Sequence, residues 1–187
     1  MKRLAWALVV SLTSSVSRAD EPQSGPKVGD QPPGFSLQVA TGDDAGKTVD
    51  YLKAWKDKPV LVIFVGEMTR PGFGLLRPLD KYARLRQPEG LQVLIVRVTD
   101  DREAAARHAR LLYEMYEIKS IAGTLEEGKA GPAEYGLHEE AQMTVVLLDK
   151  EHKVAFNLPR RAPERRDFDA IREGIDKLLG PSPVPFP

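Results

Sequence analysis

The segment "KPVLVIFVGEMTRPGFG" (residues 58–74) decides the fold of this chain. Its apolar run, residues 59–65, has the composition of a buried central strand. A short loop follows, and a helix is predicted from near Arg70 toward Arg86. A loop between a buried strand and a helix is a place where an active site is expected, yet residues 65–74 contain no cysteine, histidine or serine.

Strand and helix signals alternate on both sides of this segment. Short strands are predicted before it, at residues 34–40 and 47–52. The elements predicted after it are a buried strand at 91–98, a helix at 101–116, a hairpin of 143–149 with 154–158, and a helix at 163–179. This order predicts one α/β domain.

Apolar spacing assigns a buried face to each of the two later helices. For the first, Asp100 or Asp101 is the expected N-cap, and the inward residues are Ala104, His108, Leu111, Leu112 and Met115. For the second, Pro163 lies in the first turn, Gly180 ends the helix, and the inward residues are Phe168, Ile171, Ile175 and Leu178.

The first 19 residues have the pattern of a secretory signal peptide. Lys2 and Arg3 precede a short apolar stretch, which is followed by small residues up to Ala19. The stretch falls well short of the roughly 20 residues that span a bilayer. We therefore expect cleavage after Ala19 and a soluble mature chain that is secreted or periplasmic.

Composition divides the remaining chain into three parts. Residues 20–33 are rich in proline, glycine and aspartate and predict a flexible leader. Residues 34–180 are expected to form the domain, and the tail 181–187, "PSPVPFP", is expected to be extended or polyproline-like. The signal peptide contains three of the 27 basic residues and none of the 27 acidic ones, which leaves a net charge of −3. Such a balance supports neither a nucleic-acid partner nor an anionic membrane.

The chain contains no cysteine. Disulfides, thiol redox catalysis by its own side chains and cysteine-based zinc sites are therefore excluded. Its three histidines, at 108, 138 and 152, lack the spacing of metal ligands, and no cofactor is indicated.

Four motifs in order resemble exported thioredoxin-like reductases and the alkyl hydroperoxide reductase and thiol-specific antioxidant family. Residues 28–65 contain a "G-x-x-x-P-x-F-x-L" start, a "G-K-x-V" strand and "K-P-V-L-V-x-F". "YGL" (135–137) and "TVVLLDKEHKV" (144–154) are similar to the family's "Y-x-V" and "T-x-x-L-I-D-x-x-G-K-V". The resemblance implies a thioredoxin-like three-layer sandwich, with a mixed central sheet flanked by helices and an N-terminal β extension.

The same resemblance places the family's C-x-x-C pair on Thr69, Arg70, Pro71 and Gly72, so the proline is retained and both thiols are absent. A threonine hydroxyl does not ionise as a thiol does at a helix N-terminus. As a nucleophile Thr69 would need a base, and the loop offers only Glu67. The simpler interpretation is that Thr69 is the N-cap of the helix.

The family's cis-proline position corresponds to Met143. A cis bond without proline costs about 2.5 to 4 kcal/mol, so we expect a trans peptide bond and a reshaped docking edge. Met143 itself is expected to fill a gap in the core.

The remaining residues and segments considered as functional sites each have a structural and a functional interpretation. His108 is expected to be a partly buried, hydrogen-bonded side chain rather than a base, and His138 lies beside Glu139 and Glu140, which could make a weak metal site. The loop 118–134, longer than the family's usual connection, is either functional or a tolerated insertion. Four arginines form a basic cluster near the last helix: Arg160, Arg161, Arg165 and Arg166. The cluster is predicted to be a solvated face paired with Glu164, Asp167 and Asp169, and the alternative is a patch that binds a phosphate or an acidic partner.

The leading hypothesis is a non-catalytic binding or interaction module, whose partner is another exported protein. The alternative is an enzyme, using either Thr69, Glu67 and His138 or thiols that a partner supplies.

Overall fold

A mixed seven-stranded sheet forms the centre of the computed structural model, which describes residues 21–67 and 70–186. The strand order is β2-β1-β5-β4-β3-β6-β7. Strands β3, β4 and β5 are parallel, whereas β1, β6 and β7 join the sheet by antiparallel pairing. The strands are β1 Leu37–Val39, β2 Thr48–Val49, β3 Val60–Val65, β4 Gln92–Arg97, β5 Ile121–Leu125, β6 Met143–Leu148 and β7 Val154–Arg160.

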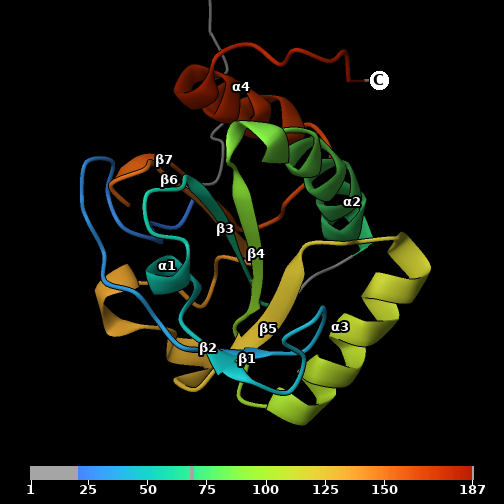
Figure 1. Ribbon diagram of the computed structural model, residues 1–187. Helices are drawn as coiled ribbons and strands as arrows, with labels where there is room; N and C mark the ends of the chain where they lie inside the picture. The colour runs from blue at the N-terminus through green and yellow to red at the C-terminus, as the bar shows by residue number, and fades with distance from the viewer. Residues whose placement is uncertain (1–20, 68–69, 187) are drawn as a thin grey trace, which may run out of the picture.

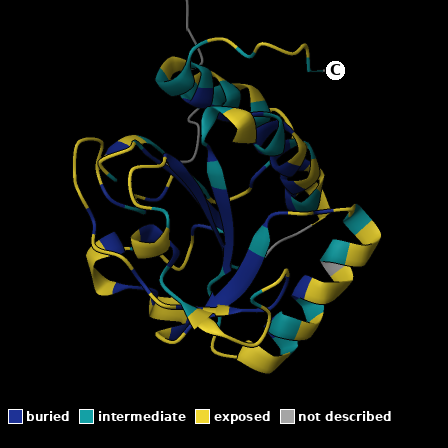
Figure 2. Cartoon of the chain, in the orientation of Figure 1, coloured by how far each residue is buried: buried dark blue, intermediate teal, exposed yellow. Residues whose placement is uncertain are grey.

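Helices cover both faces of this sheet (Figure 1). The α-helices within the described residues are α1 Tyr51–Ala54, α2 Arg70–Leu85, α3 Arg102–Tyr116 and α4 Asp167–Leu179. The larger three lie over one face, where Leu61, Ile63 and Val65 of β3 join a core cluster with residues of α2, α3 and α4. On the opposite face Val60, Val62 and Phe64 pack with α1 and a short 3₁₀ helix, Ala133–Tyr135. Figure 2 shows the buried sheet between these layers, so the expected three-layer sandwich with a mixed central sheet and an N-terminal β1–β2 extension is confirmed.

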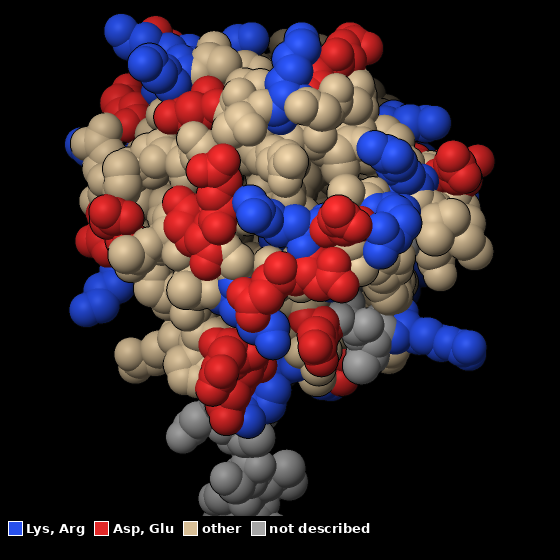
Figure 3. All heavy atoms as spheres, turned by 90° about the horizontal axis from the view of Figure 1, so that it is seen from below, with Lys and Arg blue, Asp and Glu red and all other residues tan. Residues whose placement is uncertain are grey.

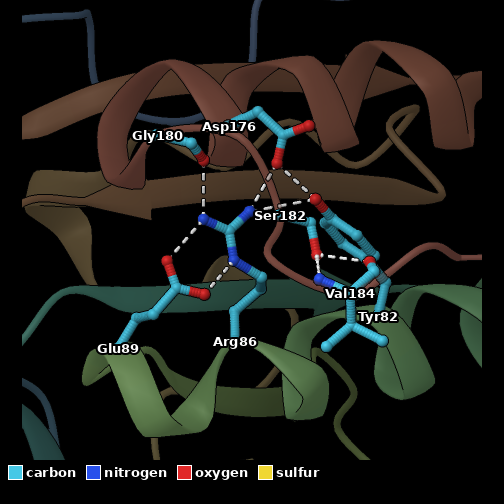
Figure 4. A network of polar contacts seen from close by, with 7 residues as sticks. All are labelled: Tyr82, Arg86, Glu89, Asp176, Gly180, Ser182 and Val184. Atoms are coloured by element: carbon cyan, nitrogen blue, oxygen red, sulfur yellow. Dashed lines mark hydrogen bonds and ion pairs between the residues drawn. The ribbon is translucent and has the colours of Figure 1, made fainter.

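A saturated polar network joins the C-terminal ends of α2 and α4 (Figure 4). Arg86 has no exposed surface, and all five of its N–H groups donate. Two go to the carboxylate of Glu89, at 2.5 and 2.8 Å, and one to the carbonyl of Gly180, at 2.7 Å. The remaining two go to Tyr82 Oη and to Asp176. Full pairing makes this burial of a charge tolerable.

The C-terminal tail packs beside this network. The ring of Phe186 lies 5.2 Å from the rings of both Tyr82 and Phe168, and Lys81 Nζ lies 5.9 Å from its centroid. The tail, which has no helix or strand through residue 186, is therefore fixed to α2 and α4 by one aromatic side chain.

The prediction of a long loop at 118–134 is wrong, because this segment contains β5, an internal strand between β4 and β1. Gly123 sits in the middle of this strand. A Cβ there would lie 2.4 Å from the carbonyl oxygen of Gln38 and 2.7 Å from Leu37 Cγ. The glycine that suggested a loop instead permits the close approach of β1.

The face predicted for α3 is also wrong. Leu111 and Met115 are 51% and 72% exposed, whereas Ala105 and Ala109 are buried. Small side chains let the helix approach β5 closely, so alanines mark the packed side here. The side chain of Leu112 lies outside the described part of the chain. Asp101 is the N-cap, its carboxylate accepting from the amide of Ala104 at 2.9 Å.

Two further boundaries differ from the sequence prediction. The strand expected at 47–52 is limited to β2, because Asp50 caps α1 by accepting from the amide of Lys53. Helix α4 begins at Asp167, four residues after Pro163, and its predicted inward residues Ile171 and Ile175 are fully buried. The hairpin of β6 and β7 is confirmed.

The leader packs on the domain. Residues 21–33 contain no helix or strand, as expected, but Ser24 is only 4% exposed. The amide of Gly29 donates to the carbonyl of Val154, and the amide of Val154 donates to the carbonyl of Asp30, both at 2.8 Å. Against the expectation of a flexible leader, this segment is attached to the start of β7. The expected signal peptide lies outside the described residues.

Candidate functional site

The candidate site lies at the edge of the sheet where β3 and β4 end and β6 begins. The amide of Gly66, just after β3, donates to the carbonyl of Gln142 at 2.9 Å, and the amide of Val98 donates to Val65 at 2.9 Å. These bonds fix the start of the loop between β3 and α2 against the strand on either side. Figure 3 looks onto this edge, where acidic side chains gather across the middle and basic ones lie among them.

The four positions that correspond to C-x-x-C are only partly described. Arg70 and Pro71 are the first residues of α2, as expected for a motif at a helix N-terminus, and Gly72 is buried in the first turn. Thr69 lies outside the described residues. Its roles as N-cap or nucleophile therefore stay predictions.

Met143 is the first residue of β6 and is fully buried. It pairs with Val65 on one side and with Arg160 on the other, and its side chain belongs to the core on the α2 face. The part of the chain that the structure describes contains no cis peptide bond, so the bond before Met143 is trans. The thioether fills the core as expected.

A half-open cavity of about 420 Å³ lies beside this loop. Its size is within the range of small-molecule sites. It is bounded by the leader, the ends of β3 and β4, and the segment before β6. The lining residues that matter below are Ser24, Phe64, Glu67, Val98, Leu137, Glu139, Ala141 and Gln142.

Ser24 of the leader connects the walls of the cavity. Its hydroxyl lies 2.7 Å from Thr144 Oγ1 and accepts from the amide of His138 at 3.0 Å. Its carbonyl accepts from Asn157 Nδ2 at 2.9 Å. One leader residue thus joins β6, β7 and the segment before β6, and sequence reasoning missed it because a serine in a Pro/Gly-rich stretch gives no such signal.

Acidic groups border the cavity. Glu67 and Glu139 are exposed, and neither forms an ion pair with another described residue. Glu140 is bound to Arg161 at 2.6 Å, and the nearby Lys129 lies 3.8 Å from Asp100. Gln142 Oε1 is buried and has no partner within residues 21–67 and 70–186. The carboxylates that line the opening, Glu67, Glu139 and Glu140, outnumber its one ammonium, Lys129.

Arg97, at the end of β4, lies behind the loop. Its guanidinium donates to the carbonyl of Gly66, whereas its buried Nε–H has no partner among the described residues. Burial lowers the pKa of Arg97, and the nearby carboxylate of Glu67 opposes that shift. The basic residue inside the apolar run "LQVLIVRV" was the available signal for this half-buried charge.

The histidines do not assemble a metal site. His138 Nδ1 accepts from the amide of Glu140 at 3.2 Å, and His108 is half-buried against the ring of Phe73, with ring centroids 5.7 Å apart. No group of three or more histidines and carboxylates close enough to hold a metal occurs in the described ranges.

The arginine cluster is divided among several carboxylates. Asp169 pairs with Arg172 rather than with the cluster. Arg165 borders two surface hollows beside Phe186. The pairs within the cluster are Arg160 with Asp167 at 2.7 Å, Arg161 with Glu140 at 2.6 Å and Arg166 with Glu164 at 3.0 Å. These pairs agree with a mostly solvated, paired face.

Comparison with known proteins shows which solved structures share this fold. No family model matches the chain, and no curated protein matches it in sequence. A protein from Chlorobium tepidum assigned as thiol:disulfide interchange protein DsbE aligns at 21% identity over 82% of this chain and 99% of its own, with a TM-score of 0.65. The peroxidoxin BcpB from Mycobacterium tuberculosis aligns at 15% identity over 81% and 97% of the two chains, with a TM-score of 0.61. A secreted thiol-disulfide isomerase from Corynebacterium glutamicum aligns at 17% identity over 78% and 85%, with a TM-score of 0.58.

The fold is therefore thioredoxin-like, in a chain without cysteine. Within residues 21–67 and 70–186, no helix is long and apolar enough to cross a membrane.

Proposed function

We propose that this protein is an exported, non-catalytic binding module that holds its ligand in the 420 Å³ cavity beside the β3–α2 loop. The cavity carries the proposal. It lies at the edge where the sequence resemblance places the thiols, and the chain contains no cysteine with which to act there. A site that keeps its hollow without a reactive group supports binding over turnover.

Export is supported by the signal pattern in residues 1–19 and by the secreted isomerase among the structural neighbours. The packed leader fits this proposal, because it would remain with the mature domain after cleavage following Ala19. Ser24 then contributes a wall of the cavity in the exported form.

The competing proposal is an enzyme. Glu67 and His138 border the same cavity, so a cysteine-independent activity with Thr69 is the form that it would take. We expect no insulin-disulfide reduction and no thiol-dependent peroxide consumption above a buffer control. Turnover that disappears in Thr69→Ala would replace the binding-module proposal.

Binding is tested with the mature chain by amide chemical shifts against a library of small neutral, acidic and basic compounds. We expect shifts at Gly66, Val98 and Leu137 for at least one class. Ala141→Phe, which places a ring in the cavity, should abolish them, whereas Ala155→Phe on the exposed face of β7 should not. A library without any binder at these amides would contradict the proposal.

A further inference from the structure

We infer that the cavity selects an alkyl chain that ends in a cation, either an ammonium or a guanidinium group. The inference rests on the proposed function, because it names the ligand class of the same cavity. The shared chemistry is that of a lysine or arginine side chain and of a free diamine.

The floor of the cavity is apolar and rigid. Phe64 is 2% exposed, and its ring lies 5.2 Å from that of Tyr135, which fixes its orientation. Val98 and Leu137 complete the apolar surface. An alkyl stem would bury this surface, as the stems of long basic side chains commonly do.

The opening supplies acceptors for a cationic end. Glu67 and Glu139 border it without an ion pair to any other described residue, and Glu140 lines it as well. A terminal ammonium or guanidinium offers three or five N–H donors and no acceptor, which matches this set. A carboxylate ligand would meet like charge.

Most of the basic groups near the cavity already have partners. Arg161 is bound to Glu140, and Lys129 lies closest to Asp100. Arg97 donates to the carbonyl of Gly66 and lies with residues of the α2 face of the sheet, whereas Phe64 of the cavity floor belongs to the opposite face. His138 Nδ1 is used by the amide of Glu140. Lys129 also lines the cavity, so a ligand meets this one ammonium beside the carboxylates of Glu67, Glu139 and Glu140, which outnumber it.

The experiment compares ligands of one shape and different charge. The mature chain is titrated with terminally blocked lysine, arginine, norleucine and glutamate, and with cadaverine and agmatine, and the shifts of Gly66, Val98 and Leu137 are followed. We expect the basic compounds to bind and the affinity to fall with added salt.

Charge-removing variants identify the acceptors. Glu67→Gln and Glu139→Gln should each weaken the basic ligands about threefold, since exposed ion pairs contribute modestly. Glu173→Gln, on the exposed face of α4, is the matched control and should change nothing.

The outcomes separate the two proposals. Equal binding of norleucine and lysine, or no effect of both glutamine variants, would overturn the cationic ligand and leave a binding cavity. If neither these compounds nor any member of the neutral and acidic library shifts the cavity amides, the binding-module proposal itself is overturned. Binding of the blocked amino acids indicates a polypeptide side chain as the source, and binding of the diamines alone indicates a free metabolite.

Discussion

Two arginines, the fully buried Arg86 and the half-buried Arg97, lie near opposite ends of β4 and differ in how completely they are hydrogen-bonded. Arg86, where α2 ends, has no exposed surface and donates all five of its N–H groups to four residues. Arg97, where β4 ends, donates to one carbonyl, and its buried Nε–H has no partner among the described residues. The first arginine is part of a completed structure, whereas the second lies beside groups that remain available.

The difference indicates where the fold is held together and where it is open to other molecules. A fully paired charge stabilises only the arrangement that pairs it, so the edge at Arg86 is fixed. At the opposite edge, Arg97, Gln142 and the carboxylates of Glu67 and Glu139 are incompletely paired within the described residues. A buried polar group without a partner is costly in a purely structural role, so each such group calls for an explanation.

The largest effect is expected from Arg86→Met, which should lower the free energy of unfolding by about 3 kcal/mol. It leaves Asp176 and Glu89 without their cation, although these carboxylates are 31% and 27% exposed, which limits the loss. Urea denaturation measures it. Arg77→Met, which removes an exposed pair with Glu117, is the control and should change stability by less than about 0.5 kcal/mol.

A smaller effect is expected at the start of α2. If Thr69 is the N-cap, Thr69→Ala should cost about 1 kcal/mol and Thr69→Ser little. The thermal midpoints of the two variants test this. Equal midpoints for alanine and the native residue would move the cap elsewhere and shift the correspondence between "TRPG" and C-x-x-C.

Low pH should weaken the polar network around Arg86, because Glu89 becomes protonated. The hydrogen bond from Arg86 lowers the pKa of Glu89 below its ordinary value of 4.5. Its contribution to stability is therefore complete above pH 4.5 and disappears as the pH falls through the lower folded-state pKa. Glu89→Gln should flatten this acid limb in urea midpoints measured between pH 6 and pH 3. An unchanged limb would show that the pair is not formed in solution.

The smallest effect is expected from Arg97→Met. Arg97 is half-buried and donates to one carbonyl, so replacing it by an apolar side chain of similar length should change stability by no more than about 0.5 kcal/mol. The same urea measurement applies. A loss as large as that of Arg86→Met would mean that the two arginines play equal structural roles, and the contrast between the edges would disappear.

Local patterns in the sequence predicted most of the fold. The run Val60–Val65 is apolar on both faces because both faces are covered, and the spacing of Ile171 and Ile175 follows a helix with one packed side. The face of α3 could not be predicted by the same rule. Alanines pack there because β5 lies close, a distance that depends on the tertiary structure.

The site was predictable only in its position. Local patterns predicted a helix from near Arg70 and a strand at 143–149, and the resemblance placed the C-x-x-C positions at 69–72 and the cis-proline position at Met143. The cavity depends on Ser24, which lies 120 residues from Thr144 in sequence, and on the turn before β6. Contacts over such distances leave no periodic signal. Gly123 shows the converse, since a residue typical of loops lies within an internal strand.

The packing of Phe186 determines how the molecule can be attached to a support. The tail leaves the domain at the edge of α2 and α4, whereas the cavity lies at the far ends of β3 and β4 (Figure 1). The leader, in contrast, forms part of the cavity wall at Ser24. A protein immobilised through its C-terminal tail would present the cavity to the surrounding solution, whereas an N-terminal tag would crowd its entrance.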